Sequence, residues 1–252
     1  IAVNGAPPSL SSRPQALQAV AAVSPGGLDL SELRIPASLV LPLMAALLVT
    51  VPVFVQAPWV RAAPMTAVLF TAPLLGLALL LERSGTGLRQ KLGVLLVGFC
   101  GSWLGGALFW GWLRMHPLWH LPVEAFALPL AVAGLGGRWR LAGAFYLSSL
   151  VGTAATDAVM AATGVMELWP QVLQAPLGEA PLLLQVAGLR VLAPLPLSGV
   201  VVVAALLLRI GKGLWGKGPI GRVAAACLVT TLVVVCLLLS AALLAPGLCG
   251  LV

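Results

Sequence analysis

The residues best suited to chemistry lie in one short stretch near the middle of the chain. An arginine, two histidines and a glutamate occur there within eleven residues, at Arg114, His116, His120 and Glu124. Such a group can bind a ligand, relay a proton or supply an axial ligand to a metal-centred pigment. The alternative is that the basic residues are ordinary interfacial loop residues and that Glu124 pairs with one of them. Because Pro117 breaks any helix between the histidines, a two-histidine metal site is not assured, and the sequence names no metal.

One further acid lies inside an apolar segment. Asp157 is preceded by small and hydroxyl residues in a stretch long enough to cross a membrane. On insertion scales an acid at mid-membrane costs about 2.5–3.5 kcal/mol, so a partner must offset that cost. Thr153 lies four residues earlier and shares the helical face of Asp157. The sequence leaves open whether Asp157 is a structural hydrogen-bonding residue of a helix bundle or a functional carboxylate.

The composition indicates which kind of protein positions these residues. Of the 252 residues, 60% are hydrophobic and 8% are charged, and the mean hydropathy is +1.08. Soluble domains carry about 25% charged residues, so a soluble protein is excluded, and no polar stretch is long enough for an extramembrane enzyme domain. No Ser-His-Asp order, Cys-His pair or HExxH motif occurs in a suitable context. We therefore expect no enzyme and name no catalytic residue.

Apolar runs of membrane-crossing length predict the fold class. A helix needs about 20 apolar residues to cross a bilayer, and we expect an all-α polytopic membrane bundle of about seven transmembrane helices. The fourth and sixth runs are short, which indicates tilted, half-buried or incomplete helices. The predicted spans are Ile35–Val55, Ala62–Leu81, Leu92–Leu113, Leu121–Leu135, Leu141–Thr163, Pro194–Leu208 and Ile220–Ala245.

The basic residues predict the orientation of these spans. If seven spans alternate, eleven of the fourteen Lys and Arg residues fall on one side, and the other side holds only Arg61, Arg114 and Arg190. Cytoplasmic loops carry an excess of Lys and Arg, which predicts a cytoplasmic N-terminus and an extracytoplasmic or lumenal C-terminus. The basic residues behind the net charge of +7 therefore lie in short loops, where they set the topology. For this reason we expect no nucleic-acid partner.

Two stretches fall outside the spans. Residues 1–34 lack an apolar pattern and predict a flexible N-terminal tail, whereas residues 35–252 form a single transmembrane helical domain. Residues 165–193 contain three prolines and several glutamines, so this stretch is too interrupted to span and too apolar to lie free in water. We expect it to form one or two short interfacial helices on the outer surface.

Small residues mark a packing face on the third predicted span. The glycines Gly98, Gly101 and Gly105 recur at intervals of three and four residues. This spacing lets another helix approach closely. We expect packing within the chain, with a dedicated dimer contact as the alternative.

The two acids are expected to share one site. Glu124 lies about one helical turn, roughly 5 Å, below the outer end of its predicted span, and Asp157 lies about 24 Å above the inner end of the next one. Both therefore reach a similar depth, where lipid exposure would be unfavourable. We expect both to face the bundle interior, with His120 at the mouth of a polar pocket. The pocket should bind a cation, a polar headgroup or a pigment ligand, or be closed by Arg114.

Several stretches resemble an uncharacterised integral membrane protein family of cyanobacteria, a domain of unknown function. The likeness is carried by residues 51–58 (VPVFVQAP), 98–106 (GFCGSWLGG), 109–114 (FWGWLR), 117–125 (PLWHLPVEA) and 152–157 (GTAATD). It covers nearly everything after residue 34 and implies an integral protein of a cyanobacterial membrane, the thylakoid or alternatively the plasma membrane. It supplies no catalytic residue.

A weaker resemblance links residues 48–114 to the first spans of apolipoprotein N-acyltransferases. In both, an aromatic-proline turn is followed by a glycine-rich helix that ends in an aromatic pair. Those enzymes carry their chemistry on a soluble nitrilase-like domain, for which this chain has no room. The resemblance implies at most a shared membrane scaffold.

These observations favour a non-enzymatic accessory, assembly or pigment-associated subunit of a photosynthetic membrane complex. Its partners would be the lipid bilayer and that complex, and its cofactor chlorophyll, carotenoid or bound lipid. The first alternative is a small-solute or ion transporter that uses Glu124 and Asp157, although no internal repeat is detectable. The second alternative is a lipid-modifying membrane enzyme.

Overall fold

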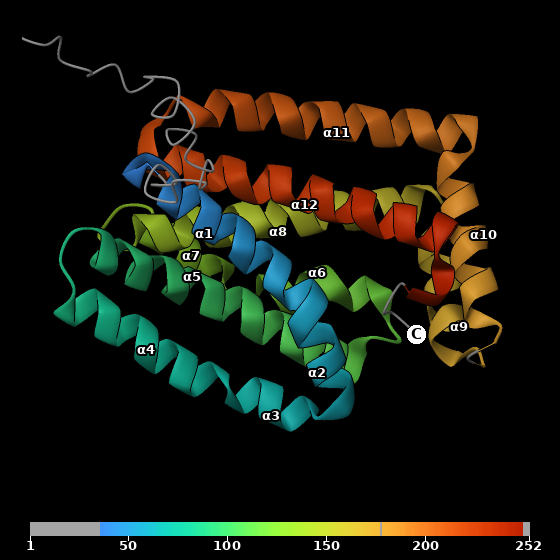
Figure 1. Ribbon diagram of the computed structural model, residues 1–252, viewed down its shortest axis with the longest axis horizontal. Coiled ribbons are helices and arrows are strands. Elements are labelled where there is room, and N and C mark those ends of the chain that lie inside the picture. Colours follow the sequence, from blue (N-terminus) through green and yellow to red (C-terminus); the bar gives the residue numbers. More distant parts are fainter. Residues whose placement is uncertain (1–35, 177, 249–252) are drawn as a thin grey trace, which may run out of the picture. The chain divides into compact units, whose positions relative to one another are not determined.

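The computed structural model describes residues 36–176 and 178–248, and every regular element within them is a helix (Figure 1). The predicted tail, residues 1–34, lies outside the described residues. The helices run in the order α1 (Ala37–Val51), η3 (Pro52–Gln56), α2 (Ala57–Ala62), α3 (Pro64–Leu69), α4 (Thr71–Ser84), α5 (Leu88–Leu108), η4 (Phe109–Leu113), η5 (Pro117–Trp119), α6 (His120–Glu124), η6 (Ala125–Ala127), α7 (Leu128–Gly134), α8 (Arg140–Ala162), α9 (Val165–Gln174), α10 (Ala180–Leu192), α11 (Pro194–Trp215), α12 (Gly218–Leu244) and η7 (Pro246–Leu248).

Several of these helices are long and apolar enough to cross a bilayer, which makes the chain an integral membrane protein. In the described part of the chain five continuous helices meet this condition: Ala37–Ala62, Pro64–Ser84, Leu88–Leu113, Pro194–Trp215 and Gly218–Leu244. A sixth span results if α8 and α9 count as one, although they are bent by 93° at their junction. The prediction of an all-helical membrane bundle is confirmed.

The fourth predicted span, Leu121–Leu135, is not one of these long helices. Its residues form a chain of short helices, α6, η6 and α7, which follow η5. Prolines at 122 and 129 lack the N–H that a continuous helix requires, and two 3-10 turns interrupt the α-helical hydrogen bonding. The predicted count of seven spans therefore stays a prediction. The sixth predicted span, in contrast, extends beyond Leu208 and ends at Trp215.

The short helices η5, α6, η6 and α7, residues 117–134, form a broken segment that nevertheless runs back along α5. Gly105 of α5 lies against Glu124, and Gly101 lies near Ala127, so the broken segment runs antiparallel to α5. At the far end Arg138 Nη1 lies 3.6 Å from Oε1 of Glu82, at the end of α4. The segment thus begins at the C-terminal end of α5 and ends beside its N-terminal end.

Glycines of α5 permit these close approaches. A Cβ at Gly98 would lie 2.5 Å from the carbonyl oxygen of Ala142, and a Cβ at Gly101 would lie 3.0 Å from the ring of Tyr146. At Gly105 it would lie 3.0 Å from the Cα of Glu124. All three glycines therefore contact other helices of the same chain, and this packing brings α6 and α8 against α5.

Aromatic and aliphatic side chains fill the core between α1, α5, α8 and α12. Trp103 is 2% exposed and Phe145 is fully buried. Phe99 lies between them, with ring centroids 5.8 Å from Trp103 and 6.3 Å from Phe145 in edge-to-face arrangements. Such pairs add about 0.5–1.5 kcal/mol to the stabilisation from burial. The core thus fixes α5 against α8, the two helices that flank α6.

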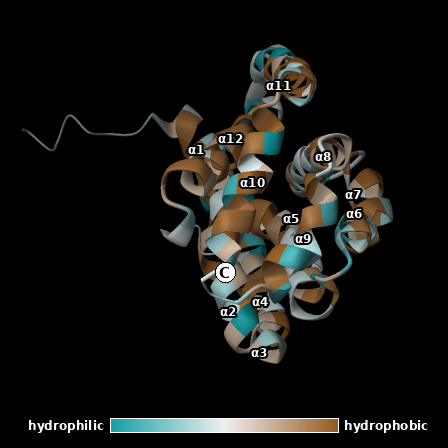
Figure 2. Cartoon of the chain, turned by 90° about the vertical axis from the view of Figure 1, so that its right-hand side faces the viewer, coloured by the Kyte–Doolittle hydropathy of each residue, from teal (hydrophilic) through white to brown (hydrophobic). Residues whose placement is uncertain are grey.

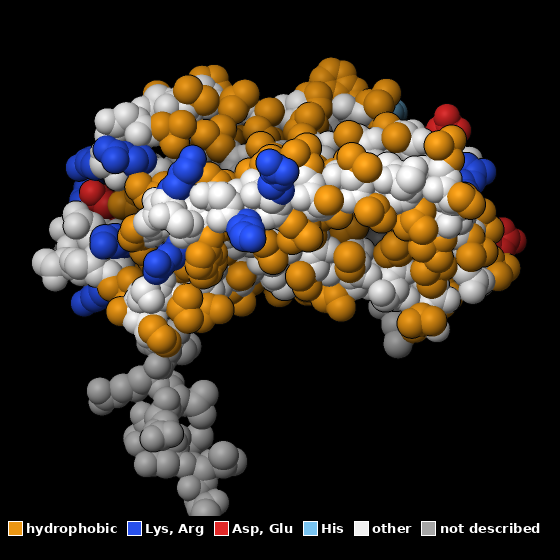
Figure 3. Space-filling model, turned by 90° about the horizontal axis from the view of Figure 1, so that it is seen from above, with side chains coloured by type: hydrophobic (Ala, Val, Ile, Leu, Met, Phe, Trp, Pro, Cys, Tyr) orange, Lys and Arg blue, Asp and Glu red, His pale blue; other side chains and the backbone are white. Residues whose placement is uncertain are grey.

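The outer surface is apolar along most of its length. Figure 2 shows brown, hydrophobic residues on the outside of the helices, and large side chains of α11 such as Leu195 and Val202 are exposed. In Figure 3 the Lys and Arg side chains gather toward the end where Figure 1 shows the turns α4–α5, α7–α8 and α11–α12. An apolar girdle with charges concentrated at one end is the surface that a bilayer requires.

The stretch 165–193 forms two short helices, α9 and α10. The helix α9 is strongly amphipathic, since Leu168 and Val172 are buried whereas Glu167 and Gln171 are exposed. A short amphipathic helix that turns away from a spanning helix suits the membrane interface. The interfacial position of this stretch stays a prediction.

Candidate functional site

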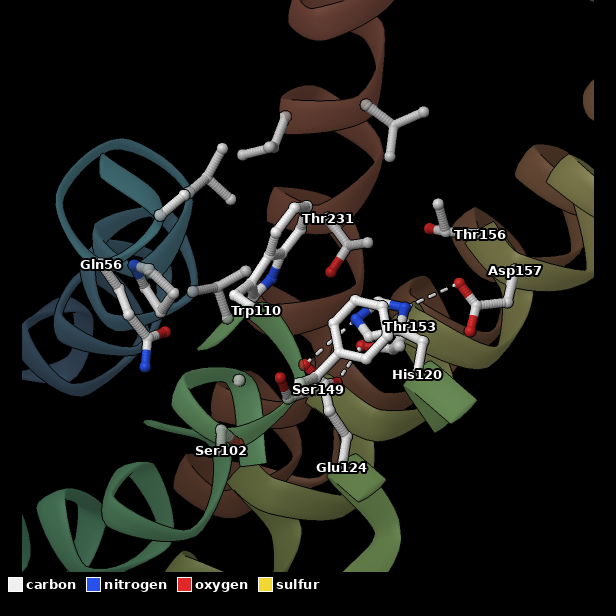
Figure 4. Close-up of a pocket in the computed structure, with 18 of the residues that line it drawn as sticks. Gln56, Ser102, Trp110, His120, Glu124, Ser149, Thr153, Thr156, Asp157 and Thr231 are labelled. Carbon is white, nitrogen blue, oxygen red and sulfur yellow. Dashed lines mark hydrogen bonds and ion pairs between the residues drawn. The ribbon is translucent and has the colours of Figure 1, made fainter. Parts of the chain in front are cut away.

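A cavity of about 270 Å³ lies within the bundle and is lined by α1, η3, α5, η4, α6, α8, α9 and α12. Its walls are mainly apolar and aromatic. Figure 4 shows the polar side chains that reach it from separate helices, which are Gln56, Ser102, His120, Glu124, Ser149, Thr153, Thr156, Asp157 and Thr231. Mostly apolar walls with a few convergent polar groups are typical of small-molecule sites.

His120 lies between two carboxylates at the wall of this cavity. Its Nδ1 is 2.9 Å from Oδ1 of Asp157, and its Nε2 is 3.3 Å from Oε1 of Glu124 (Figure 4). The histidine and Glu124 share one face of α6, four residues apart, whereas Asp157 comes from α8. We name these three residues the carboxylate–histidine cluster. Its side chains are between 13% and 21% exposed, so the cluster is largely desolvated.

Neighbouring hydroxyl groups hold Glu124 in place. Thr153 Oγ1 lies 2.9 Å from Oε2 of Glu124 and donates its hydrogen bond there. The hydroxyl of Tyr146 donates to the backbone carbonyl of Glu124 and accepts a hydrogen bond of 3.1 Å from the backbone N–H of Ala127. Both contacts come from α8, so α8 fixes the broken segment as well as supplying Asp157.

Aromatic rings cover the cluster on one side. The imidazole of His120 lies 4.3 Å from the ring centroid of Phe109 and 6.4 Å from that of Trp110. Trp110 contacts Trp169 of α9 at 5.5 Å, and Trp169 Nε1 donates a hydrogen bond of 2.9 Å to the carbonyl oxygen of Arg114. These rings exclude water from one face of the imidazole and join α9 to the cavity wall.

Two π-helical turns border the cavity. The turn η3 ends at Gln56, and the backbone N–H of Ala57 donates to the carbonyl of Pro52, five residues back. The turn η4 begins at Phe109 and includes Trp110. A π-turn inserts one extra residue into a helix and occurs frequently at functional sites. Here Gln56 of η3 and Trp110 of η4 both line the cavity.

Gln56 is the most deeply buried polar residue of the site. Its side chain is 1% exposed, and Nε2 donates a hydrogen bond of 2.5 Å to the carbonyl oxygen of Trp103. Its Oε1 lies against Gly106, where a Cβ would come within 2.9 Å. A glycine at 106 therefore makes room for the amide.

The contacts of the carboxylate–histidine cluster determine how many protons it holds. An ionised carboxylate only accepts hydrogen bonds, and a neutral imidazole carries a single N–H. Both ring nitrogens of His120 face carboxylate oxygens, so both contacts are favourable only when the cluster holds one proton more than neutral histidine and two carboxylates. Its net charge is then −1, and loss of that proton gives −2. The cluster thus has two states inside the bundle, which differ by one proton.

The structure brings together some of the residues singled out from the sequence and separates others. Glu124, Asp157 and His120 meet at the cavity, which both carboxylates line. His116 is exposed and does not line the cavity. Arg114 does not line it either, although its backbone carbonyl accepts the hydrogen bond from Trp169. Closure of the pocket by Arg114, one of the alternatives, stays a prediction.

Sequence reasoning missed several polar residues of the cavity. Gln56 lies just beyond the end of the first predicted span, and Ser149 and Thr231 lie inside apolar spans. Thr231 packs so closely on Gly152 that a Cβ there would lie 2.6 Å from its Oγ1. The sequence feature that could have identified these cavity residues is an uncharged polar residue in or beside a membrane-crossing run. That signal is weak, because serine and threonine also bond to their own helix.

Within residues 36–176 and 178–248 there is no group of three or more His, Cys, Asp and Glu side chains arranged to hold a metal ion. Both nitrogens of His120 face carboxylates, so ligation of a metal-centred pigment by His120 would require breaking one of these contacts.

Comparison with known proteins gives a family but no function. No curated protein matches the chain significantly, and no solved structure does. A family model described as "Protein of unknown function (DUF3120)" matches residues 45–243, which include the whole cavity and the carboxylate–histidine cluster. The resemblance to an uncharacterised family of unknown function is thereby confirmed. With most of its length matched by this model, the chain belongs to the DUF3120 family.

Proposed function

We propose that this protein is a proton-linked carrier that binds a small organic solute in the cavity between α1, α5, α8 and α12. The observation that carries the proposal is the carboxylate–histidine cluster, a proton-holding group at the wall of a cavity inside a membrane protein. Ionisable side chains within a membrane are unfavourable unless paired, and they commonly mark proton relays and solute pathways.

The broken helices beside the cavity support the same function. Transporters often form their substrate sites with discontinuous helices, whose interruptions line the binding cavity. Here the site is flanked by the segment η5–α6–η6–α7 and by the π-turns η3 and η4. Interrupted backbone is costly in a lipid environment unless it lines a cavity or is covered by protein. A rigid scaffold protein would have no need of three such interruptions around one cavity.

The geometry of His120 gives less support to a pigment-binding subunit or to an enzyme. A subunit that binds chlorophyll through His120 would need a free ring nitrogen there, whereas His120 uses both nitrogens on carboxylates. An acyl-transferring or hydrolytic enzyme would need a nucleophile beside the imidazole, but Nε2 of His120 faces Glu124 instead of a hydroxyl or thiol. The photosynthetic membrane remains the setting that the sequence resemblance implies, and the carrier proposal is independent of it.

We propose further that the chain crosses the membrane seven times, with the broken segment as the fourth crossing. The segment begins at the C-terminal end of α5. The residue Arg138, just after the segment, pairs with Glu82 near the N-terminal end of α5, and this geometry supports a crossing. The end that carries the basic turns α4–α5, α7–α8 and α11–α12 would then face the cytoplasm.

The carrier is tested by proton flux in liposomes. Purified protein is reconstituted with a pH-sensitive dye in the lumen, and one of three probes is added outside: benzyltrimethylammonium, benzyl alcohol or phenylmethanesulfonate. These probes share one ring, differ in charge and carry no proton across the bilayer themselves. We expect at least one probe to change the lumenal pH with the wild-type protein, and this change to be lost in Asp157→Asn and Glu124→Gln.

A matched control separates the cluster from acids in general. Glu167→Gln removes an exposed acid of α9 that does not line the cavity, so it should retain the wild-type flux. Size-exclusion profiles identify variants that fail to fold. If no probe changes the lumenal pH, or if folded Asp157→Asn keeps the wild-type rate, the carrier proposal is wrong.

A further inference from the structure

The charges that line the cavity limit the kind of solute it can hold. Glu124 and Asp157 both line it, and no lysine or arginine does so among the described residues. The carboxylate–histidine cluster carries a net charge of −1 when it holds its proton and −2 when it does not. Charges interact strongly in a largely desolvated site. An anionic solute is therefore disfavoured, and a cationic one is attracted.

One carboxylate oxygen remains available to such a solute. Oδ1 of Asp157 contacts His120, and within the described residues no hydrogen-bond donor is placed on Oδ2. Both oxygens of Glu124, in contrast, are engaged, one by His120 and one by Thr153. Asp157 is thus the member of the cluster that can contact a cation directly while the remainder of the cluster stays intact.

The aromatic walls of the cavity suit the apolar body of an organic cation. Trp110 and Trp169 line the cavity together, and indole faces attract ammonium groups by about 0.5–2 kcal/mol, depending on desolvation. The volume of about 270 Å³ is larger than a metal ion requires and lies near the lower end of small-molecule sites. A carboxylate together with aromatic rings in one cavity is the chemistry that recognises an amine or a quaternary ammonium.

From these observations we infer that the carrier's substrate is a small organic cation, and that this cation and the proton of the carboxylate–histidine cluster exchange for each other. The inference rests on the proposed carrier function. With the proton bound and the cavity empty of solute, the site carries −1. With the cation bound and the proton released, it again carries −1. Exchange therefore keeps the charge of the site constant at −1. If the cation bound without proton release, the charge would be 0, and if the site held neither cation nor proton, it would be −2.

The groups that face His120 indicate that the exchanged proton comes from the carboxylate–histidine cluster. The titratable groups that face His120 are Glu124 on its own helix and Asp157 on α8. The hydroxyl of Tyr146 on α8 bonds to backbone groups, the carbonyl of Glu124 and the N–H of Ala127. The rings from η4 and α9 carry no charge, and α1 with η3 and α12 contribute Gln56 and Thr231 to the polar wall. By linkage, release of one proton makes cation affinity rise with pH, by at most about tenfold per pH unit.

The exchange is tested by measuring binding and proton release together. Benzyltrimethylammonium is titrated into the full-length protein in detergent, in weak buffer with a pH dye, and the tryptophan fluorescence reports binding. We expect close to one proton released per cation bound and an affinity that tightens as the pH is raised. Asp157→Asn should weaken binding at least tenfold and abolish proton release, whereas Glu167→Gln should behave as wild type.

The neutral and anionic probes separate this inference from the carrier itself. If benzyl alcohol or phenylmethanesulfonate releases the proton and drives flux while the cation does neither, the substrate class is wrong and the carrier stands. If the cation binds without proton release at any pH, the exchange is wrong. If no probe binds and none drives flux, the substrate class and the carrier proposal both fail.

Discussion

Gly105 of α5 lies directly against Glu124 of α6, so that a Cβ at position 105 would come within 3.0 Å of the Cα of Glu124. This contact joins the glycine face of α5 to the carboxylate–histidine cluster. The position of the carboxylate therefore depends on the absence of a side chain on a neighbouring helix. A single methyl group added at position 105 must displace α6 by a few tenths of an ångström.

The first prediction concerns that contact. Gly105→Ala should lower the thermal stability in detergent, because overpacking costs about 1–3 kcal/mol and outweighs the 0.5–1 kcal/mol that alanine gains in a helix. It should also weaken binding of benzyltrimethylammonium, since α6 carries two members of the cluster. Gly199→Ala on the exposed face of α11 meets nothing within 4 Å and should be neutral or stabilising. Equal effects of the two substitutions would contradict this reading of the packing.

The second prediction concerns the hydroxyl group beside Glu124. Thr153→Val keeps the shape of the side chain but removes the hydrogen bond to Oε2, which should destabilise the protein by about 1–3 kcal/mol because the acceptor is largely desolvated. The matched control is Thr163→Val, whose hydroxyl bonds only to carbonyls of its own helix. Chemical or thermal denaturation in detergent measures both. A smaller loss for Thr153→Val than for Thr163→Val would argue that Glu124 does not need this partner.

The third prediction concerns the buried amide of the π-turn η3. Gln56→Leu removes the hydrogen bond to the carbonyl oxygen of Trp103, at a cost of about 0.5–1.5 kcal/mol. The variant should fold but lose polar character at the cavity wall, so its probe-driven flux should change more than its melting temperature. Gln171→Leu, on the exposed face of α9, serves as the control and should leave both unchanged. If folded Gln56→Leu kept the wild-type flux, Gln56 would have no role in solute transport.

The fourth prediction concerns topology and uses glycines in turns that have room for a side chain. Cysteines are introduced at Gly136, Gly178 and Gly216, none of which has a neighbour closer than 3.9 Å to a new Cβ. Seven crossings predict that Gly136→Cys and Gly216→Cys react with an impermeant maleimide from one side of the membrane and Gly178→Cys from the other. Thr86→Cys, at the exposed turn between α4 and α5, lies before the broken segment and should react from the same side as Gly136→Cys. Labelling of Thr86→Cys and Gly136→Cys from opposite sides would mean that residues 117–134 do not cross.

The sequence alone determined the helical membrane class and four of the five long helices to within a few residues at most ends. This was possible because crossing a bilayer requires a continuous apolar run, which is a local property of the chain. The fifth, α11, extended beyond its predicted end, since Arg209 and Lys212 do not stop a helix that leaves the apolar region. Composition likewise identified Glu124 and Asp157 as residues that need partners inside a membrane.

The tertiary structure decided which partners they have. His120 meets Asp157 across 37 positions of sequence, and that contact depends on α6 folding back along α5 next to α8. The sequence placed His120 at the mouth of the expected pocket but could not give its two carboxylate contacts, because these depend on the packing that also leaves His116 exposed. Gln56 became a site residue through a π-turn, a change of one residue in helical register that apolar periodicity does not record. Membrane helices are specified by composition, whereas the side chains they bring together are specified by how closely their backbones pack.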